Sequence, residues 1–219
     1  MIERKTLHQR AYETLFHLIA IGEFPPGFQF DEQTLADRLG ISRTPLRAAI
    51  ARLTQEGLVV NLPYRGTSVK SLSIDEVDDV FRVRGALEVL AIRLAVQRIN
   101  SSQVAVIEAL LDECEVALSE GNILAFGDAD ARFHRAIADA SENITLINML
   151  DNLRIRVHLF RDIANGDPDL RERTATERVA IMNAIVSRDG DAAALLIEHH
   201  IASVRESVIR QLRTRTHYK

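Results

Sequence analysis

The chain has 219 residues, of which 47% are hydrophobic and 26% charged, with a single cysteine and a formal net charge of −4. This composition is typical of a globular protein of one or two domains and excludes a disulfide-based framework, and a lone cysteine favours a reducing cytoplasm. No apolar run approaches the ~20 residues of a membrane span, and MIERKTLHQR lacks the apolar core of a signal peptide, so we expect a cytoplasmic protein without a membrane segment.

Charge is distributed unevenly along the chain. Residues 1–72 contain nine Lys/Arg and seven Asp/Glu, whereas the remaining residues contain 18 and 24. From Arg38 to Arg52 the sequence contains four arginines and no acidic residue. This local excess of positive charge keeps nucleic acid among the expected partners, although the chain as a whole is acidic.

The first predicted elements are two helices separated by a turn. Residues 6–21 alternate apolar and polar residues at helical spacing, and the pattern ends at Gly22. The prolines of the following GEFPPGFQF exclude a helix there. Asp31 is a suitable N-cap for a short second helix, EQTLADRL, which Gly40 ends.

A third helix and a hairpin follow. The helix is expected over residues 43–56, where apolar residues recur at helical spacing. Leu58–Asn61 and Thr67–Lys70 predict two short strands, joined through a turn that contains Arg65 and Gly66. The order of helix, helix, short turn, helix and hairpin is that of a winged helix-turn-helix domain.

The start of the third helix carries an unusual charge. Ser42 is a natural N-cap, but Arg43 and Arg47 lie where the helix dipole is positive and disfavours cations. An external anion explains their position, because phosphates bind at helix N-termini and an arginine fork binds guanine O6 and N7 in the major groove. We therefore expect double-stranded operator DNA to be contacted by Ser42, Arg43, Thr44, Arg47, Arg65 and Gly66.

From Ile74 onward the sequence predicts an all-α bundle. This part contains one proline and no convincing strand. Helical patterns run over roughly 75–99, 102–120, 122–141, 144–165, 169–187 and 190–213. We therefore predict a mainly α protein with an N-terminal winged helix-turn-helix domain, residues 1–72, and an all-helical domain, residues 73–219, for effector binding and dimerisation.

Five polar residues fall on the apolar stripes of these predicted helices. A lone buried histidine is usually hydrogen-bonded in a core, and a lone arginine usually pairs with an acid such as Glu88. Five such residues from four helices are harder to explain separately, because burying them unpaired is unfavourable. Together they favour a solvated, polar cavity that binds a small ligand. The residues are Arg84, Asp130, His134, Arg178 and His200.

Both parts of the chain resemble one family. GEFPPGFQFDEQTLADRLGISRTPLRAAIARLTQEGLVVNLPYRGTSV is similar to the DNA-binding signature of the GntR family of bacterial transcription regulators, with its PG turn, SRTP-x-R helix and RG-x-SV wing in order. Ala48–Ala49 departs from the family's usual Glu-Ala, a change expected to alter helix support more than groove contact. The helical part resembles the FCD ligand-sensing domain of the FadR-like subfamily in VFRVRGALEVLAIRLA, DADARFHRAIADASEN and AIVSRDGDAAALLIEHHI.

The resemblance also implies a metal site. Metal-binding FCD domains combine an Asp-x3-His pair with two further histidines 22 residues apart, which matches Asp130, His134 and His200 here and suits zinc, nickel or manganese. Arg178 replaces the remaining histidine, and its guanidinium opposes a cation but suits a carboxylate or phosphate. Two versions stay open: a metal that grips the effector while Arg178 neutralises it, or direct binding without metal, which the charge of Arg178 favours.

We expect a ligand-responsive transcription regulator of the repressor type, not an enzyme. One short helix reads few base pairs, so a homodimer on a two-fold site is expected, with affinity modulated by a small anionic metabolite. A metal-dependent hydrolase using Asp130, His134 and His200 is the alternative, but the sequence has no HExxH or comparable motif. A protein-binding module with surface arginines is a third interpretation.

Overall fold

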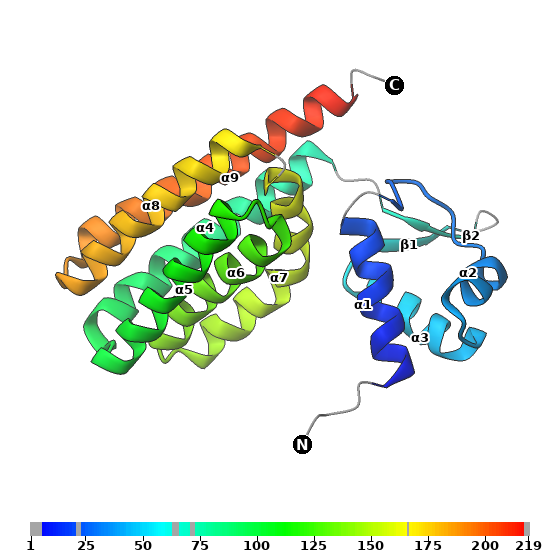
Figure 1. Cartoon of the computed structure of the whole chain (residues 1–219), viewed down its shortest axis with the longest axis horizontal. Helices are drawn as coiled ribbons and strands as arrows, with labels where there is room; N and C mark the ends of the chain where they lie inside the picture. The colour runs from blue at the N-terminus through cyan, green and yellow to red at the C-terminus, as the bar shows by residue number, and fades with distance from the viewer. Residues whose placement is uncertain (1–5, 21–22, 63–65, 71–72, 166, 217–219) are drawn as a thin grey trace. The chain divides into compact units, whose positions relative to one another are not determined.

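The computed structural model describes residues 6–20, 23–62, 66–70, 73–165 and 167–216 (Figure 1). The chain divides into two compact units, Met1–Ser73 and Ile74–Lys219. Within the described ranges, none of the helices combines the length and the apolar character that a membrane span requires.

The first unit is a winged helix-turn-helix, as predicted. It contains the helices α1 (Leu7–Ala20), α2 (Glu32–Leu39) and α3 (Arg43–Gln55) and the strands β1 (Val59–Leu62) and β2 (Gly66–Val69). α1 packs on α3, and the strands form an antiparallel hairpin beside the three helices (Figure 1). Its core includes the fully buried side chains of Leu15, Leu46 and Leu53.

Local capping explains the ends of α2. Asp31 Oδ1 accepts hydrogen bonds from the backbone N–H groups of Gln33 and Thr34, at 2.9 and 3.0 Å. Gly40 ends the helix at φ +64°, a left-handed conformation that glycine adopts without strain. The turn from Gly40 to Ser42 then leads directly into α3.

Two details of this unit differ from the sequence prediction. Ser42 occupies the N-cap position of α3, but its side chain makes no capping hydrogen bond. Both strands are displaced by one residue from their predicted bounds, because Leu62 pairs with Gly66 at the closed end of the hairpin. The left-handed backbone of Gly66, with φ +73°, sets where the second strand begins.

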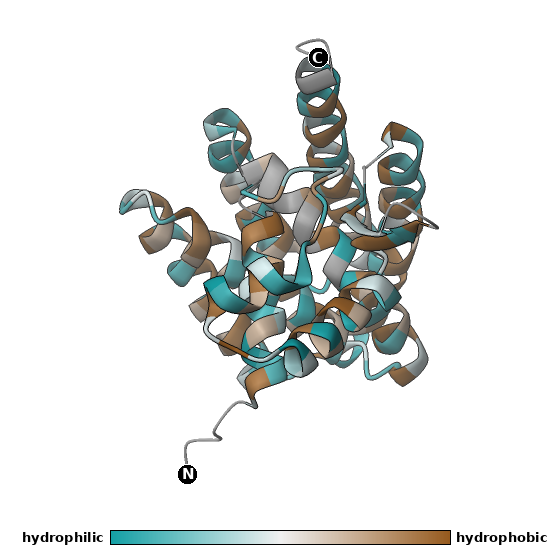
Figure 2. Ribbon diagram, turned by 90° about the vertical axis from the view of Figure 1, so that its right-hand side faces the viewer, coloured by the Kyte–Doolittle hydropathy of each residue, from teal (hydrophilic) through white to brown (hydrophobic). Residues whose placement is uncertain are grey.

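The second unit is an all-α bundle, also as predicted. Its helices are α4 (Ile74–Arg98), α5 (Ser101–Ser119), α6 (Ile123–Ala140), α7 (Ile144–Asn165), α8 (Pro168–Val186) and α9 (Gly190–Thr216). α4 packs along α9 and against α6 and α7, while α5 covers α6 and α8 packs on α9. Figure 2 shows apolar and polar residues alternating along the helices, which is why each helix can bury one face.

The interior of the bundle is not purely apolar. Phe81, Phe133 and Phe160 are buried in the core, with Phe81 stacked on Phe160. The five polar residues that the stripes singled out are buried as well: Arg84, Asp130, His134, Arg178 and His200. Since buried charges are stable only with partners, their contacts define the centre of this unit.

Candidate nucleic-acid interface and polar centre of the bundle

The tip of α3 exposes a cationic surface. Arg43 begins the helix and Arg47 lies one turn later, and their side chains are 51% and 59% exposed. Thr44 is exposed between them, and the first turn contains no acidic residue. Because Ser42 does not cap the helix with its side chain, the N–H groups of this turn remain open to an external acceptor.

A carboxylate of α2 faces these arginines, a contact that the sequence pattern does not predict. Glu32 Oε2 accepts a hydrogen bond from Arg47 Nε at 2.6 Å and from Arg43 Nη2 at 3.2 Å. The hydrogen bond from Arg47 lowers the pKa of Glu32 against the opposing effect of its partial burial. Glu32 is 11 residues from Arg43 in sequence, and only the turn between α2 and α3 brings them together.

The wing contributes Gly66 to the predicted interface. Gly66 is exposed at the start of β2, and a Cβ built there meets no atom within 4 Å. Its left-handed backbone, not crowding, is what favours glycine. Arg65, the other predicted wing contact, lies outside the described residues.

In the bundle, Glu88 links two of the predicted residues. Arg84 Nε donates to Glu88 Oε1 at 2.6 Å, and His134 Nδ1 lies 2.5 Å from Glu88 Oε2. Burial acts to raise the pKa of Glu88, but its interactions with Arg84 and His134 together outweigh burial and lower that pKa to about 2. Burial lowers the pKa of His134 to about 4, so its imidazole is neutral at pH 7.

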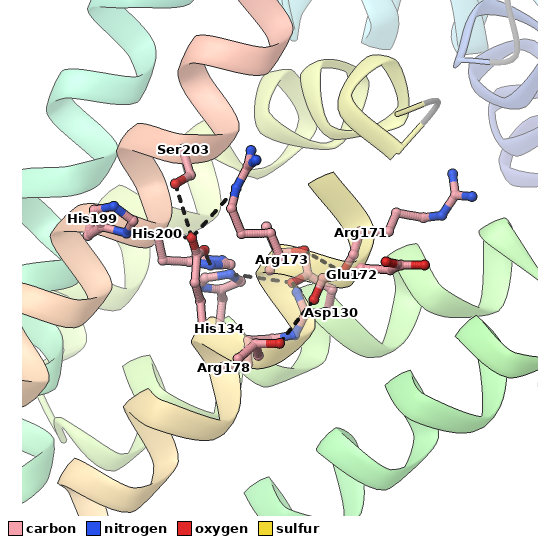
Figure 3. Close-up of polar contacts among 12 residues, drawn as sticks. Asp130, His134, Arg171, Glu172, Arg173, Arg178, His199, His200 and Ser203 are labelled. Atoms are coloured by element: carbon pink, nitrogen blue, oxygen red, sulfur yellow. Dashed lines mark hydrogen bonds and ion pairs between the residues drawn. The ribbon is translucent and has the colours of Figure 1, made fainter. Parts of the chain in front are cut away.

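Arg178 and Asp130 form a second buried pair. Arg178 Nη1 donates to Asp130 Oδ1 at 2.7 Å, and the same oxygen lies 3.6 Å from His134 Nε2 (Figure 3). The Arg178 guanidinium also lies over the ring of Phe126, 4.9 Å from its centroid. Its Nε and Nη2 atoms are buried and have no hydrogen-bond partner among the residues that the structure describes.

A third carboxylate, Glu177, holds His200. His200 Nδ1 lies 2.8 Å from Glu177 Oε2, and Ser203 Oγ donates to Glu177 Oε1 at 3.1 Å. Burial acts to raise the pKa of Glu177, but its interactions with His200, together with Ser203 and His199, outweigh burial and lower the pKa. Sequence reasoning missed Glu177, whose one visible signal is its position next to Arg178 in the sequence.

Three residues could hold a divalent metal, but one of them, Asp130, already binds the guanidinium of Arg178. Asp130, His134 and His200 each offer one ligand atom, and these atoms lie within 4.8 Å of one another. The Nδ1 atoms of His134 and His200 are hydrogen-bonded to the carboxylates of Glu88 and Glu177. In many metal sites this arrangement orients Nε2 toward the metal. Three ligands therefore fit a metal, whereas the guanidinium of Arg178 bound to Asp130 opposes one.

The described residues line two hollows near this centre. One, of about 60 Å³, lies beside Arg84, Glu88 and His134 and is lined on another side by α7. The other, of about 550 Å³, lies between α5 and α8 and includes Arg178. The predicted residues thus form one chain of contacts from Arg84 to Arg178, and different hollows lie at its two ends.

Each of the two units matches a known protein family. The model of the family "Bacterial regulatory proteins, gntR family" matches residues 7–69, and that of the FCD domain matches residues 79–203. An uncharacterised HTH-type transcriptional regulator of Bacillus subtilis, YdhC, is 30% identical over 83% of this chain and 82% of its own length. The HTH-type transcriptional repressor RspR of Escherichia coli is 27% identical over 94% of this chain and 90% of its own length.

The fold is shared with a solved structure. Escherichia coli McbR/YncC superposes with a TM-score of 0.75 and 24% identity, covering 97% of this chain and 100% of the other. This similarity supports the pairing of a winged helix-turn-helix with a helical bundle in one chain.

Proposed function

The chain belongs to the gntR family of bacterial regulatory proteins and carries an FCD domain, and from this premise we propose that it is a dimeric repressor controlled by a small anionic metabolite. It is a transcriptional regulator, as its relatives are. Repression is proposed because RspR, similar over 94% of this chain, is named a repressor.

We propose that α3 reads operator DNA from its N-terminal end. The observation that carries this proposal is the exposure of Arg43 and Arg47 in the first two turns of α3, the second helix of the helix-turn-helix. Arginine forks bind guanine O6 and N7 in the major groove, and the open N–H groups of the first turn suit a phosphate. Ser42 and Thr44 lie at the same tip, and Gly66, with its neighbour Arg65, is proposed to bring the wing to the adjacent groove.

We propose a homodimer on a two-fold site. α3 has 13 residues, so a single copy reads only a few base pairs and two copies are needed for useful specificity. A dimer with two-fold symmetry imposes a two-fold operator. Exposed apolar side chains of the bundle, among them Val83 and Leu90 on α4 and Val186 on α8, are available to an interface.

The effector site is proposed at Arg178. A buried guanidinium with two unpartnered nitrogen atoms is costly, and a ligand carboxylate that accepted from Nε and Nη2 would relieve the cost. Arg84 is neutralised by Glu88, so it is proposed as a secondary anion contact that becomes available when this pair rearranges. Asp130, His134 and His200 complete the lining.

The effector acts only if it binds one domain arrangement better than another, typically by about 1–3 kcal/mol. α4 is the element through which that preference is proposed to pass. It begins at Ile74, directly after the end of the DNA-binding unit, and carries Arg84 and Glu88.

We propose the version without metal, because Arg178 already donates to Asp130. The version with metal has its own support in the carboxylate-held Nδ1 atoms of His134 and His200. A divalent ion would be held there by Asp130, His134 and His200 and would act as a Lewis acid toward the effector carboxylate.

Two measurements on the full-length protein test this proposal. Selection of duplexes from a random-sequence pool gives the preferred site, whose two-fold symmetry is expected. Native mass spectrometry of the purified protein then identifies bound small molecules and metals. A single dominant carboxylate-containing compound, one per chain, supports the proposal; selection of no consensus duplex contradicts it.

A further inference from the structure

The carboxylate of Glu32 is placed between the two arginines assigned to DNA recognition. One oxygen, Oε2, accepts from Arg47 Nε at 2.6 Å and from Arg43 Nη2 at 3.2 Å. The Glu32 side chain is 28% exposed, about half the exposure of either arginine. Glu32 therefore lies behind the arginine tips and holds them from the side of α2.

The charge of Glu32 is stable in this position. Its pKa is lowered by the hydrogen bond from Arg47, with a further contribution from Arg43, so the side chain is an anion at neutral pH. Glu32 also lies in the first turn of α2, where the helix dipole favours negative charge. The contact thus pairs one negative charge with two positive ones.

A carboxylate at this place works against simple affinity for DNA. Phosphates repel it, and it competes with them for both arginines. If Arg43 and Arg47 acted only as phosphate anchors, the protein would bind DNA more tightly without Glu32. General affinity for DNA therefore does not explain the contact.

The geometry of the contact indicates that purpose. Arg47 meets Glu32 through Nε, which leaves its two terminal Nη groups for another acceptor. Those two groups form the end-on fork that matches guanine O6 and N7. A side chain as long as arginine loses rotamer freedom when it binds, and a prior contact reduces that loss.

We propose that Glu32 is a positioning residue that sets the sequence specificity of α3. It holds the guanidinium group of Arg47 in an orientation suited to guanine, and it weakens the binding of both Arg47 and Arg43 to phosphates at random sequence. This inference rests on the proposed recognition role of α3. It adds a residue that touches no base to the determinants of specificity.

The test compares E32Q with wild type on two duplexes. One is the consensus duplex that wild type selects from a random pool, and the other is the same duplex with scrambled sequence. Gln keeps the size of the side chain but removes the charge. E23Q is the matched control, because Glu23 pairs with Arg38 on the same unit and its loss changes the net charge equally without touching Arg43 or Arg47.

For E32Q we expect discrimination between the two duplexes to fall roughly tenfold, as expected when a bidentate base contact is weakened. Affinity for the scrambled duplex should stay equal or rise, and its log–log salt dependence should steepen by roughly 0.9 as an arginine gains a phosphate. E23Q should keep the discrimination of wild type within about twofold, because surface charges alone change it little. Thermal unfolding verifies that both variants are folded.

A double-mutant cycle with R47A separates positioning from general charge effects. If Glu32 acts through Arg47, E32Q should change discrimination much less in the R47A background. Equal discrimination by E32Q and wild type would overturn the inference while leaving α3 as the recognition helix. Unchanged operator affinity of R47A would instead overturn the assignment of α3 itself.

Discussion

Arg178 Nη1 donates a 2.7 Å hydrogen bond to Asp130 Oδ1 in the centre of the FCD domain. Sequence resemblance placed Arg178 where metal-binding FCD domains have a histidine. In the structure its guanidinium pairs with Asp130, one of the three remaining candidate metal ligands. The cationic side chain therefore competes with a metal for Asp130 directly.

Replacing Arg178 with histidine should create a metal site. R178H removes the competing charge and completes the four-ligand pattern, so it should retain close to one zinc, nickel or manganese ion per chain. Wild type, purified without chelator, should contain no stoichiometric metal by inductively coupled plasma mass spectrometry. Adding D130N to R178H removes a ligand and serves as the control. Stoichiometric metal in wild type would refute the metal-free version of the site.

The response to effector should depend on the geometry of Arg178 as well as its charge. R178K keeps the positive charge but loses the planar fork, so it should weaken binding of the co-purifying compound about tenfold or more. R84K tests the secondary contact in the same way. Isothermal titration calorimetry measures both, with R93K, at an exposed arginine of α4, as the matched control. Wild-type affinity in R178K and R84K together would exclude these arginines as anion contacts.

Acid should destabilise the bundle through His134. Its folded-state pKa of about 4 is below the ordinary value of 6.5, so the unfolded chain binds the proton more readily. The free energy of unfolding is therefore highest above pH 6.5, and it decreases by at most about 3 kcal/mol as the pH falls toward 4. Glu88, with a folded-state pKa of about 2, extends the loss to lower pH.

Urea unfolding between pH 4 and 7 measures this effect. The free energy of unfolding of H134Q should decline less on acidification than that of wild type. H17Q removes an exposed histidine of the other unit and should follow the wild-type curve. A pH dependence of H134Q identical to that of wild type would contradict the burial of a neutral imidazole.

The protein should sediment as a dimer. At micromolar concentration we expect a species of twice the 24.5 kDa chain mass, because two copies of α3 are needed for a two-fold site. Analytical ultracentrifugation with and without the selected duplex measures the mass. A 24.5 kDa monomer under both conditions would be incompatible with the dimer.

Much of the fold follows from local sequence signals. Asp31 and Gly40 cap α2 where they were expected to, and the bundle helices begin and end within three residues of their predicted bounds. These features depend on helical periodicity and on residues that favour helix ends, which are readable from a short stretch of chain. The strands slipped by one residue because pairing at Gly66 sets the register.

The partners of the site residues were less accessible from sequence. The apolar stripes identified Arg84, Asp130, His134, Arg178 and His200 as inward-facing, which is a property of one helix at a time. Glu32 and Glu177 meet their partners across helices, 15 and 23 residues away. Such contacts depend on how helices pack, which periodicity does not specify. Glu88 was within reach because it lies four residues from Arg84 on the same helix.

The affinity of R43A and R47A for the selected duplex tests the central claim most directly, since it asks whether α3 reads DNA from its N-terminal end. Fluorescence anisotropy at fixed salt gives the dissociation constants of both variants and wild type. R38A, which alters an arginine at the end of α2, is the control. Each α3 variant should lose about 1–3 kcal/mol on the selected duplex and less on a scrambled one. Wild-type affinity in both variants would contradict recognition by this helix.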